Sequence, residues 1–137
     1  MNRRKPTAVV YNDVYKLHAP LGNAPEFAVR CDAVMAALRA APFDPPIVEL
    51  APRLAQEEDL LLCHDRAYVD SVRRDVESGR AALTAGDTEI NEHSWLVARW
   101  AAGGVLRAVD AVASGEAQNA FCAVRPPGHH AGVARGE

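Results

Sequence analysis

The sequence lacks the long apolar run that a membrane-spanning helix needs, and no apolar region follows its basic N-terminal residues as it would in a secretory signal. It also lacks an excess of positive charge, and a net charge of −3 gives no reason to expect a nucleic-acid partner. Its three cysteines are scattered without a Cys-x-x-Cys pair, which argues against a disulfide framework and a thiolate zinc site. These absences indicate a protein of the reducing cytoplasm that binds neither membrane nor nucleic acid.

What is present is the composition of an ordinary globular domain. Apolar residues make up 49% of the chain and charged residues 24%. A chain of 137 residues is long enough to bury a core of its own, and it contains no internal repeat or low-complexity segment. We therefore expect residues 1–137 to form a single domain.

The order of the predicted elements favours an α/β fold. Strands are predicted at 7–11, 47–50 and 120–124, and helices from about 25 to Pro42, at 56–62, from Asp65 to Gly79 and at 91–113. Strands that alternate with helices predict a parallel sheet with helices on its faces, and the continuous apolar run at 120–124 predicts a strand covered on both faces. Gly103 and Gly104 each cost the long helix roughly 1 kcal/mol relative to alanine, which close packing against the sheet would justify.

The strand at 120–124 leads into the motif Arg-Pro-Pro-Gly-His-His-Ala, which spans residues 125–131. Proline fixes φ and glycine permits conformations closed to other residues, so the turn is stiff. It presents His129 and His130 beyond the carboxyl end of a strand, where open α/β sheets place their ligands. Neighbours on an extended segment point in opposite directions, so the two rings converge only if the loop is curved.

Two histidines can divide the roles of general base and general acid between them, because the ordinary pKa of histidine lies near neutral pH. Taken without context, two adjacent histidines are more often a surface or polar-core pair than a catalytic pair. Arg125 either anchors the turn through its guanidinium or is simply solvated.

The motif and the sequence before it resemble the histone deacetylase superfamily, which includes acetylpolyamine amidohydrolases and acetoin-utilisation proteins. The similarity covers nearly the whole chain in ordered blocks at 17–18, 24–30, 51–55, 60–69, 86–88, Ser94, 101–104 and 119–131. It implies the three-layer parallel sheet of the arginase/deacetylase fold, with helices on both faces, truncated here to its first strands and helices.

The resemblance implies zinc-dependent hydrolysis of an acetylated amine, in which zinc polarises the acetamide carbonyl and activates water. His129 is similar to the family's inner histidine, which a buried carboxylate orients, and His130 to the outer one, the general base and acid. Arg30 resembles the arginine that lines the internal cavity, and a helix arginine in a salt bridge is an equal alternative. His18 and Asp87 are similar to loop residues that border the substrate channel, and each has the alternative of a local hydrogen-bonding role.

Two departures from the family pattern bear on these implications. Ala24 stands where the family often has histidine. This difference bears on the hydrogen bonding of the first loop and not on the fold. Relatives also bind zinc through an Asp-x-His pair and a further aspartate downstream of the histidines, where their catalytic tyrosine also lies. This sequence contains no Asp-x-His. Because catalytic zinc needs about three protein ligands, we expect the chain alone to bind no zinc and to lack deacetylase activity.

Three interpretations stay open. The chain is the N-terminal part of a zinc-dependent deacetylase, a truncated remnant that has lost the chemistry, or a subunit completed by a separate C-terminal half. Without later strands, residues 120–124 would lie exposed at an edge or on a face, and this predicts a homo-oligomer formed through that surface. The sequence does not choose among acetyl-lysine, acetylpolyamine and other acetylated substrates.

Overall fold

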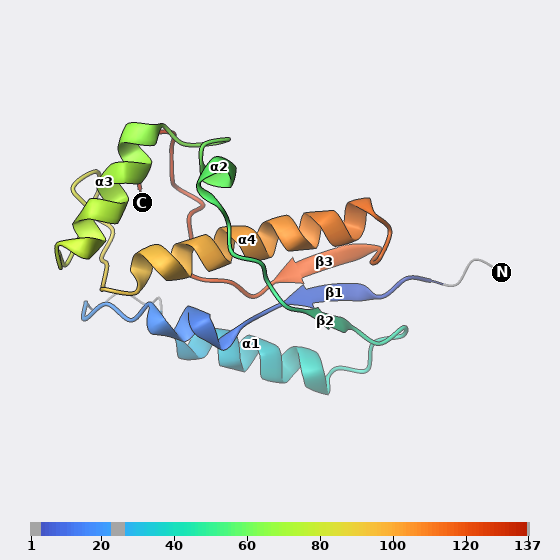
Figure 1. Ribbon diagram of the computed structural model, residues 1–137. Helices are drawn as coiled ribbons and strands as arrows, with labels where there is room; N and C mark the ends of the chain where they lie inside the picture. The colour runs from blue at the N-terminus through green and yellow to red at the C-terminus, as the bar shows by residue number, and fades with distance from the viewer. Residues whose placement is uncertain (1–3, 23–26, 137) are drawn as a thin grey trace.

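A small parallel sheet lies at the centre of the computed structural model, which describes residues 4–22 and 27–136 (Figure 1). Its strands are β1 (Thr7–Val10), β2 (Val48–Leu50) and β3 (Asn119–Cys122), in the order β2-β1-β3. β1 is parallel to both neighbours, and its Val9 lies beside Glu49 on one side and Phe121 on the other. The sheet is the parallel one that alternating strands and helices predict.

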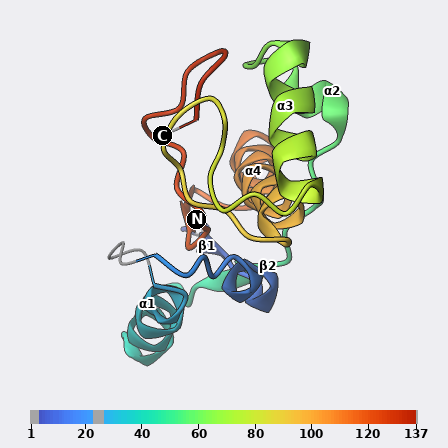
Figure 2. The same cartoon turned by 90° about the vertical axis from the view of Figure 1, so that its left-hand side faces the viewer.

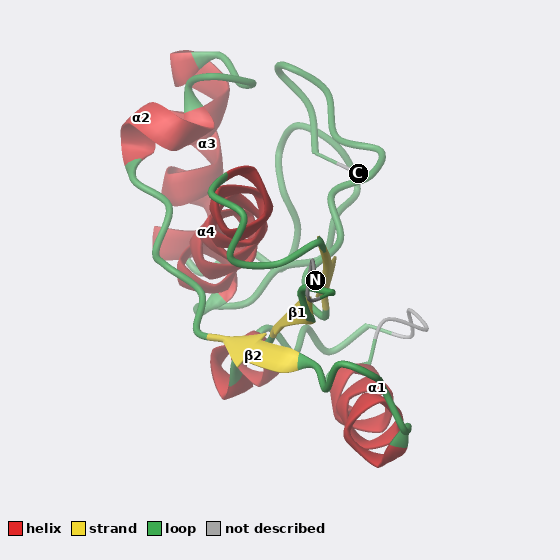
Figure 3. Cartoon of the chain, turned by 90° about the vertical axis from the view of Figure 1, so that its right-hand side faces the viewer, coloured by secondary structure: helices red, strands yellow, loops and turns green. Residues whose placement is uncertain are grey.

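Two helices cover the two faces of the sheet, α1 on one side and α4 on the other (Figures 1 and 3). The helices are η1, a 3-10 helix (Asp13–Leu17), α1 (Val29–Ala40), α2 (Glu57–Leu60), α3 (Arg66–Glu77) and α4 (Ser94–Ala113). Because side chains alternate along a strand, Ala8 and Val10 pack against α4, whereas Val9 packs against α1. These three layers confirm the predicted α/β architecture.

α2 and α3 lie on the side of α4 that faces away from α1 (Figure 2). An apolar cluster joins α3 to the following loop and to the start of α4, and consists of Val72, Val76, Leu83, Ile90 and Trp95. Gly79 ends α3 with a φ of 74°, a left-handed conformation that favours glycine. Within the described ranges, we find no helix that combines the length and apolarity needed to cross a membrane.

The first helix departs from its predicted buried face. The spacing of apolar residues predicts that Phe27 and Val34 share this face with Cys31, but both are exposed. The buried residues of α1 are Cys31 and Met35. Met35 is buried because it packs against Val9 of the sheet. The predicted start of this helix, at residues 25–26, lies outside the described residues.

β3 is an edge strand in this chain. Its residues Asn119, Ala120 and Phe121 are exposed, although Ala123 just beyond it is buried. The prediction of a strand covered on both faces is wrong for β3, because Cys122 packs against the α4 cluster on one face whereas Phe121 on the other face is exposed. The alternative expectation, that this apolar strand is exposed at an edge, holds for Ala120 and Phe121 and not for Ala123.

Candidate functional site

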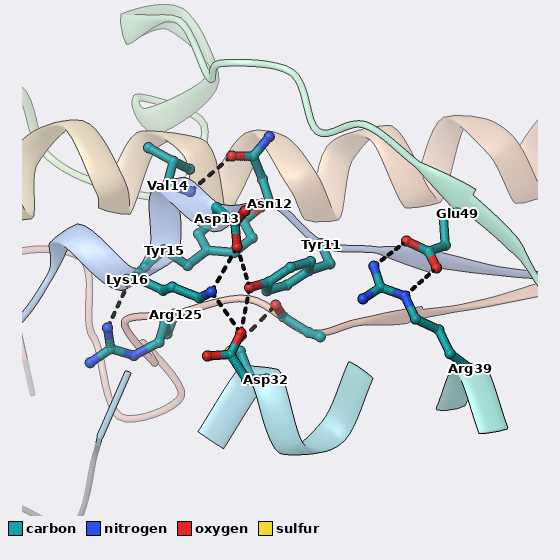
Figure 4. Close-up of polar contacts among 12 residues, drawn as sticks. Tyr11, Asn12, Asp13, Val14, Tyr15, Lys16, Asp32, Arg39, Glu49 and Arg125 are labelled. Carbon is teal, nitrogen blue, oxygen red and sulfur yellow. Dashed lines mark hydrogen bonds and ion pairs between the residues drawn. The ribbon is translucent and has the colours of Figure 1, made fainter. Parts of the chain in front are cut away.

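Arg125 fixes the start of the turn that carries the histidine pair (Figure 4). Its side chain is 2% exposed. Nη1 donates to the backbone oxygen of Tyr15 at 2.7 Å and also to that of His18. Tyr15 lies in η1 and His18 directly follows it, so the chain after β3 is tied to the chain after β1. Of the two interpretations of Arg125, the structure shows the anchor and not the solvated side chain.

His129 and His130 occupy the two central positions of a tight turn. The backbone N–H of Ala131 donates to the oxygen of Gly128 at 3.0 Å, which closes the turn around them. Their ring centroids are 4.1 Å apart, edge to face at 73°. Both side chains are exposed. The curvature therefore brings together two imidazoles that an extended segment would hold apart.

A cavity of about 450 Å³ beside this turn is lined by two of the predicted channel residues, His18 and Asp87. Pro126 and Pro127 form part of its wall, so the structure brings the loop residues and the Pro-Pro turn together. The described residues that line it include neither histidine of the pair. Arg30 is not among them either, since it lies exposed on α1. The catalytic and channel roles of these residues stay predictions.

The buried ring of His18 is held at the start of α4. Its Nδ1 lies 2.8 Å from Ser94 Oγ, which accepts from the Asn91 N–H at 2.8 Å and donates to Asn91 Oδ1 at 3.0 Å. His18 Nδ1 thus joins a buried hydrogen-bonded group with the Ser94 hydroxyl and Asn91. Sequence reasoning missed Asn91 and Ser94 as partners of His18. The available signal was an Asn-x-x-Ser pattern at the start of the long helix.

A second cavity, of about 380 Å³, lies between α3, α4 and the histidine turn, and its walls are mainly apolar. His64 contributes to its lining, and its Nδ1 lies 2.9 Å from the backbone oxygen of Gly132. The His64 ring also packs against Tyr68, with centroids 5.4 Å apart. His64 thus ties the segment after the histidine pair to the beginning of α3.

The residues present do not fit a catalytic zinc site. Across 4–22 and 27–136, no group of three or more histidine, cysteine, aspartate or glutamate side chains is arranged to hold a metal ion. His129 and His130 offer two nitrogens from neighbouring residues, and their rings meet edge to face. A catalytic zinc site requires about three protein ligands and one open position. The described residues therefore supply too few ligands for a catalytic zinc ion.

Most of the chain is similar to known deacetylases. The family model of the histone deacetylase domain matches residues 24–137. A probable deacetylase of Archaeoglobus fulgidus is 36% identical over 127 residues, which cover 91% of this chain and 35% of the relative. The human polyamine deacetylase HDAC10 is 35% identical over 133 residues, which cover 90% of this chain and 20% of the relative.

A solved structure gives the same result at the level of the fold. The crystal structure of the HDA15 HD domain superposes with a TM-score of 0.84 and 31% identity, covering 97% of this chain and 39% of that one. The chain therefore spans between 20% and 39% of the length of these relatives. These matches confirm the resemblance seen in the sequence: the chain belongs to the histone deacetylase domain family.

Proposed function

We propose that these residues are the N-terminal part of a zinc-dependent deacetylase domain and contribute its proton-transfer histidines. The observation that carries the proposal is the edge-to-face contact of His129 and His130 on one turn after a parallel strand. Amide hydrolysis needs a base that takes a proton from water and an acid that gives one to the leaving amine. Two imidazoles 4.1 Å apart can supply both functions at one reacting group.

The substrate class in this proposal is an acetylated amine. His130 is the general base and general acid, and His129 is the inner histidine that supports it. The cavity beside the turn supports a channel role for His18 and Asp87, and the same role is proposed for Arg30 by resemblance alone. The zinc of such a domain would need carboxylate ligands beyond those arranged here. We accordingly propose that this chain by itself has no deacetylase activity.

The purified chain, supplied with zinc and an acetyl-lysine peptide or an acetylpolyamine, is expected to release no acetate above the protein-free rate. The physical reason is that two histidines without further ligands do not hold zinc, so the carbonyl is not polarised. Acetate release measured by a coupled assay checks this. Turnover that His130→Ala abolishes would contradict the inactivity of the isolated chain.

The same assay tests the proposed histidine role once the domain is completed. A separately expressed C-terminal part of a relative, carrying Asp-x-His, is added to the chain. Restored acetate release that is lost in His130→Ala, and retained in His93→Ala, would support the proposal. His93 is a matched control because its Nε2 contacts only the neighbouring Glu92 carboxylate, at 3.4 Å, among the ion pairs described. Restored turnover that His130→Ala leaves intact would contradict it.

One observation favours a second function, a homo-oligomeric binding or structural module. Phe121 on the β3 edge is 48% exposed, and Val109 on the outer face of α4 is 57% exposed. Apolar edge strands pair with other chains, so we propose association of two or more copies through β3. Light scattering is expected to give a mass above one chain, and Phe121→Lys to lower it towards the monomer. A parent protein that stays monomeric at high concentration would count against this module.

A further inference from the structure

An ionic cluster on η1 takes no part in the proposed proton transfer, yet it joins elements that support the histidine turn (Figure 4). Lys16 Nζ lies 2.9 Å from Asp13 Oδ1 and 2.8 Å from Asp32 Oδ1. The Tyr11 hydroxyl lies 2.9 Å and 3.0 Å from the same two oxygens. Asp13 belongs to η1, as Lys16 does, whereas Asp32 belongs to α1. Among the ion pairs of residues 4–22 and 27–136, the Lys16–Asp32 contact therefore bridges the two helices.

The charges in this cluster depend on Lys16. Hydrogen bonds from Lys16 lower the pKa of both Asp13 and Asp32, and those to Asp32 and Asp13 raise the pKa of Lys16. Burial and hydrogen bonding to the carboxylates raise the pKa of Tyr11 to about 12, so this hydroxyl stays a neutral donor. Tyr11 has one proton for two carboxylate oxygens. Without the ammonium, the two carboxylates would face each other with like charge.

One peptide unit connects this cluster to the anchor of the turn. The oxygen of Tyr15, which accepts from Arg125 Nη1 at 2.7 Å, belongs to the carbonyl bonded to the backbone nitrogen of Lys16. A change in the backbone at Lys16 therefore moves the acceptor of Arg125. Pro126 and Pro127 follow Arg125 directly, and their fixed φ carries a change of orientation onward to the histidines.

We propose that Lys16 is a positioning residue for the histidine pair, because its bridge to Asp32 on α1 holds the Tyr15 carbonyl to which Arg125 is hydrogen-bonded. The catalytic importance of Lys16 rests on the proposed proton-transfer function, whereas its effect on the geometry of the histidine pair is independent of that function. The end of η1 is also held from the other side, where Asn91 Nδ2 donates to the Leu17 oxygen at 2.8 Å. Loss of Lys16 therefore loosens the turn without unfolding the domain.

The test is the substitution Lys16→Met in the full chain, at a side chain that is 39% exposed. Proton–carbon spectra of the imidazole Cε1–H groups are expected to show shifted signals for His129 and His130. Amide hydrogen exchange at residues 128–131 is expected to become faster on the order of fivefold, as for a locally loosened segment. Lys16→Arg retains the cation and is expected to restore both readouts.

Two substitutions give a matched control within the same cluster. Asp32→Asn removes the partner on α1 and is expected to reproduce the effect of Lys16→Met. Asp13→Asn removes a carboxylate of the same kind within η1 and is expected to leave the histidine signals near those of the parent. Unchanged histidine signals in Lys16→Met, or equal effects of the two asparagine variants, would overturn the proposal. These experiments do not measure turnover, so unchanged histidine signals would contradict the positioning role of Lys16 without contradicting the proposed function. Conversely, a completed domain without activity would contradict the proposed function and would leave the positioning role of Lys16 intact.

Discussion

Replacing Arg125 by methionine is expected to lower the free energy of unfolding by about 3 kcal/mol. Methionine occupies much of the same space but has no donor, so the backbone oxygens of Tyr15 and His18 lose their bonds to the guanidinium. Both bonds are buried, and a buried hydrogen bond to a charged group contributes roughly 1.5–3 kcal/mol. Urea unfolding followed by circular dichroism measures the change.

Arg74→Met is the matched control for this loss. Arg74 is an exposed arginine on α3 whose Nε donates to the backbone oxygen of Asp70 at 3.3 Å, so its removal is expected to cost within about 0.5 kcal/mol. Arg125→Lys keeps the charge but not the guanidinium fork. Its loss of unfolding free energy should therefore lie between those of Arg125→Met and Arg74→Met. A loss for Arg125→Met no larger than that for Arg74→Met would contradict the anchoring role of Arg125.

The sequence predicts the elements of this fold well where the signal is local. The predicted strand at 7–11 and the predicted helix at 91–113 correspond to β1 (Thr7–Val10) and α4 (Ser94–Ala113). The buried face of α1 is less predictable, because Val34 and Met35 are both apolar. Their burial is decided by the way the helix lies on Val9, a tertiary contact that local periodicity does not encode.

The same distinction applies to the candidate site. The Pro-Pro-Gly-His-His pattern predicts a stiff turn, and the structure gives a closed turn with its two rings together. The anchor of that turn has no comparable signal, because Arg125 is bonded to backbone oxygens at Tyr15 and His18, 110 and 107 residues earlier in the chain. Any residue type carries such an oxygen, so only tertiary packing, in which Tyr15 of η1 lies in one cluster with Val124 after β3, identifies these acceptors.

Replacing Gly103 by alanine is expected to destabilise the protein by about 3 kcal/mol, although alanine is the better helix former by roughly 1 kcal/mol. A Cβ atom at this position would lie 1.8 Å from the backbone oxygen of Arg53 and 2.6 Å from the backbone nitrogen of Ala55. This segment cannot easily withdraw, because the Ala55 N–H donates to the oxygen of Arg99 at 3.1 Å and its own oxygen accepts from Arg99 Nε at 2.9 Å. Thermal unfolding should show a Tm lower by several degrees.

Gly104→Ala separates this clash from helix propensity, since both substitutions gain the same propensity in the same helix. The three atoms nearest to its Cβ would all belong to side chains, namely Tyr15 Oη at 2.8 Å, Val10 Cγ1 at 3.1 Å and Val124 Cγ1 at 3.3 Å. Side chains can shift where a hydrogen-bonded backbone cannot, so a loss below about 1.5 kcal/mol is expected. The predicted packing against the sheet is thus correct for Gly104, whereas Gly103 lies against the segment before α2. A larger loss for Gly104→Ala than for Gly103→Ala would contradict this assignment of the two glycines.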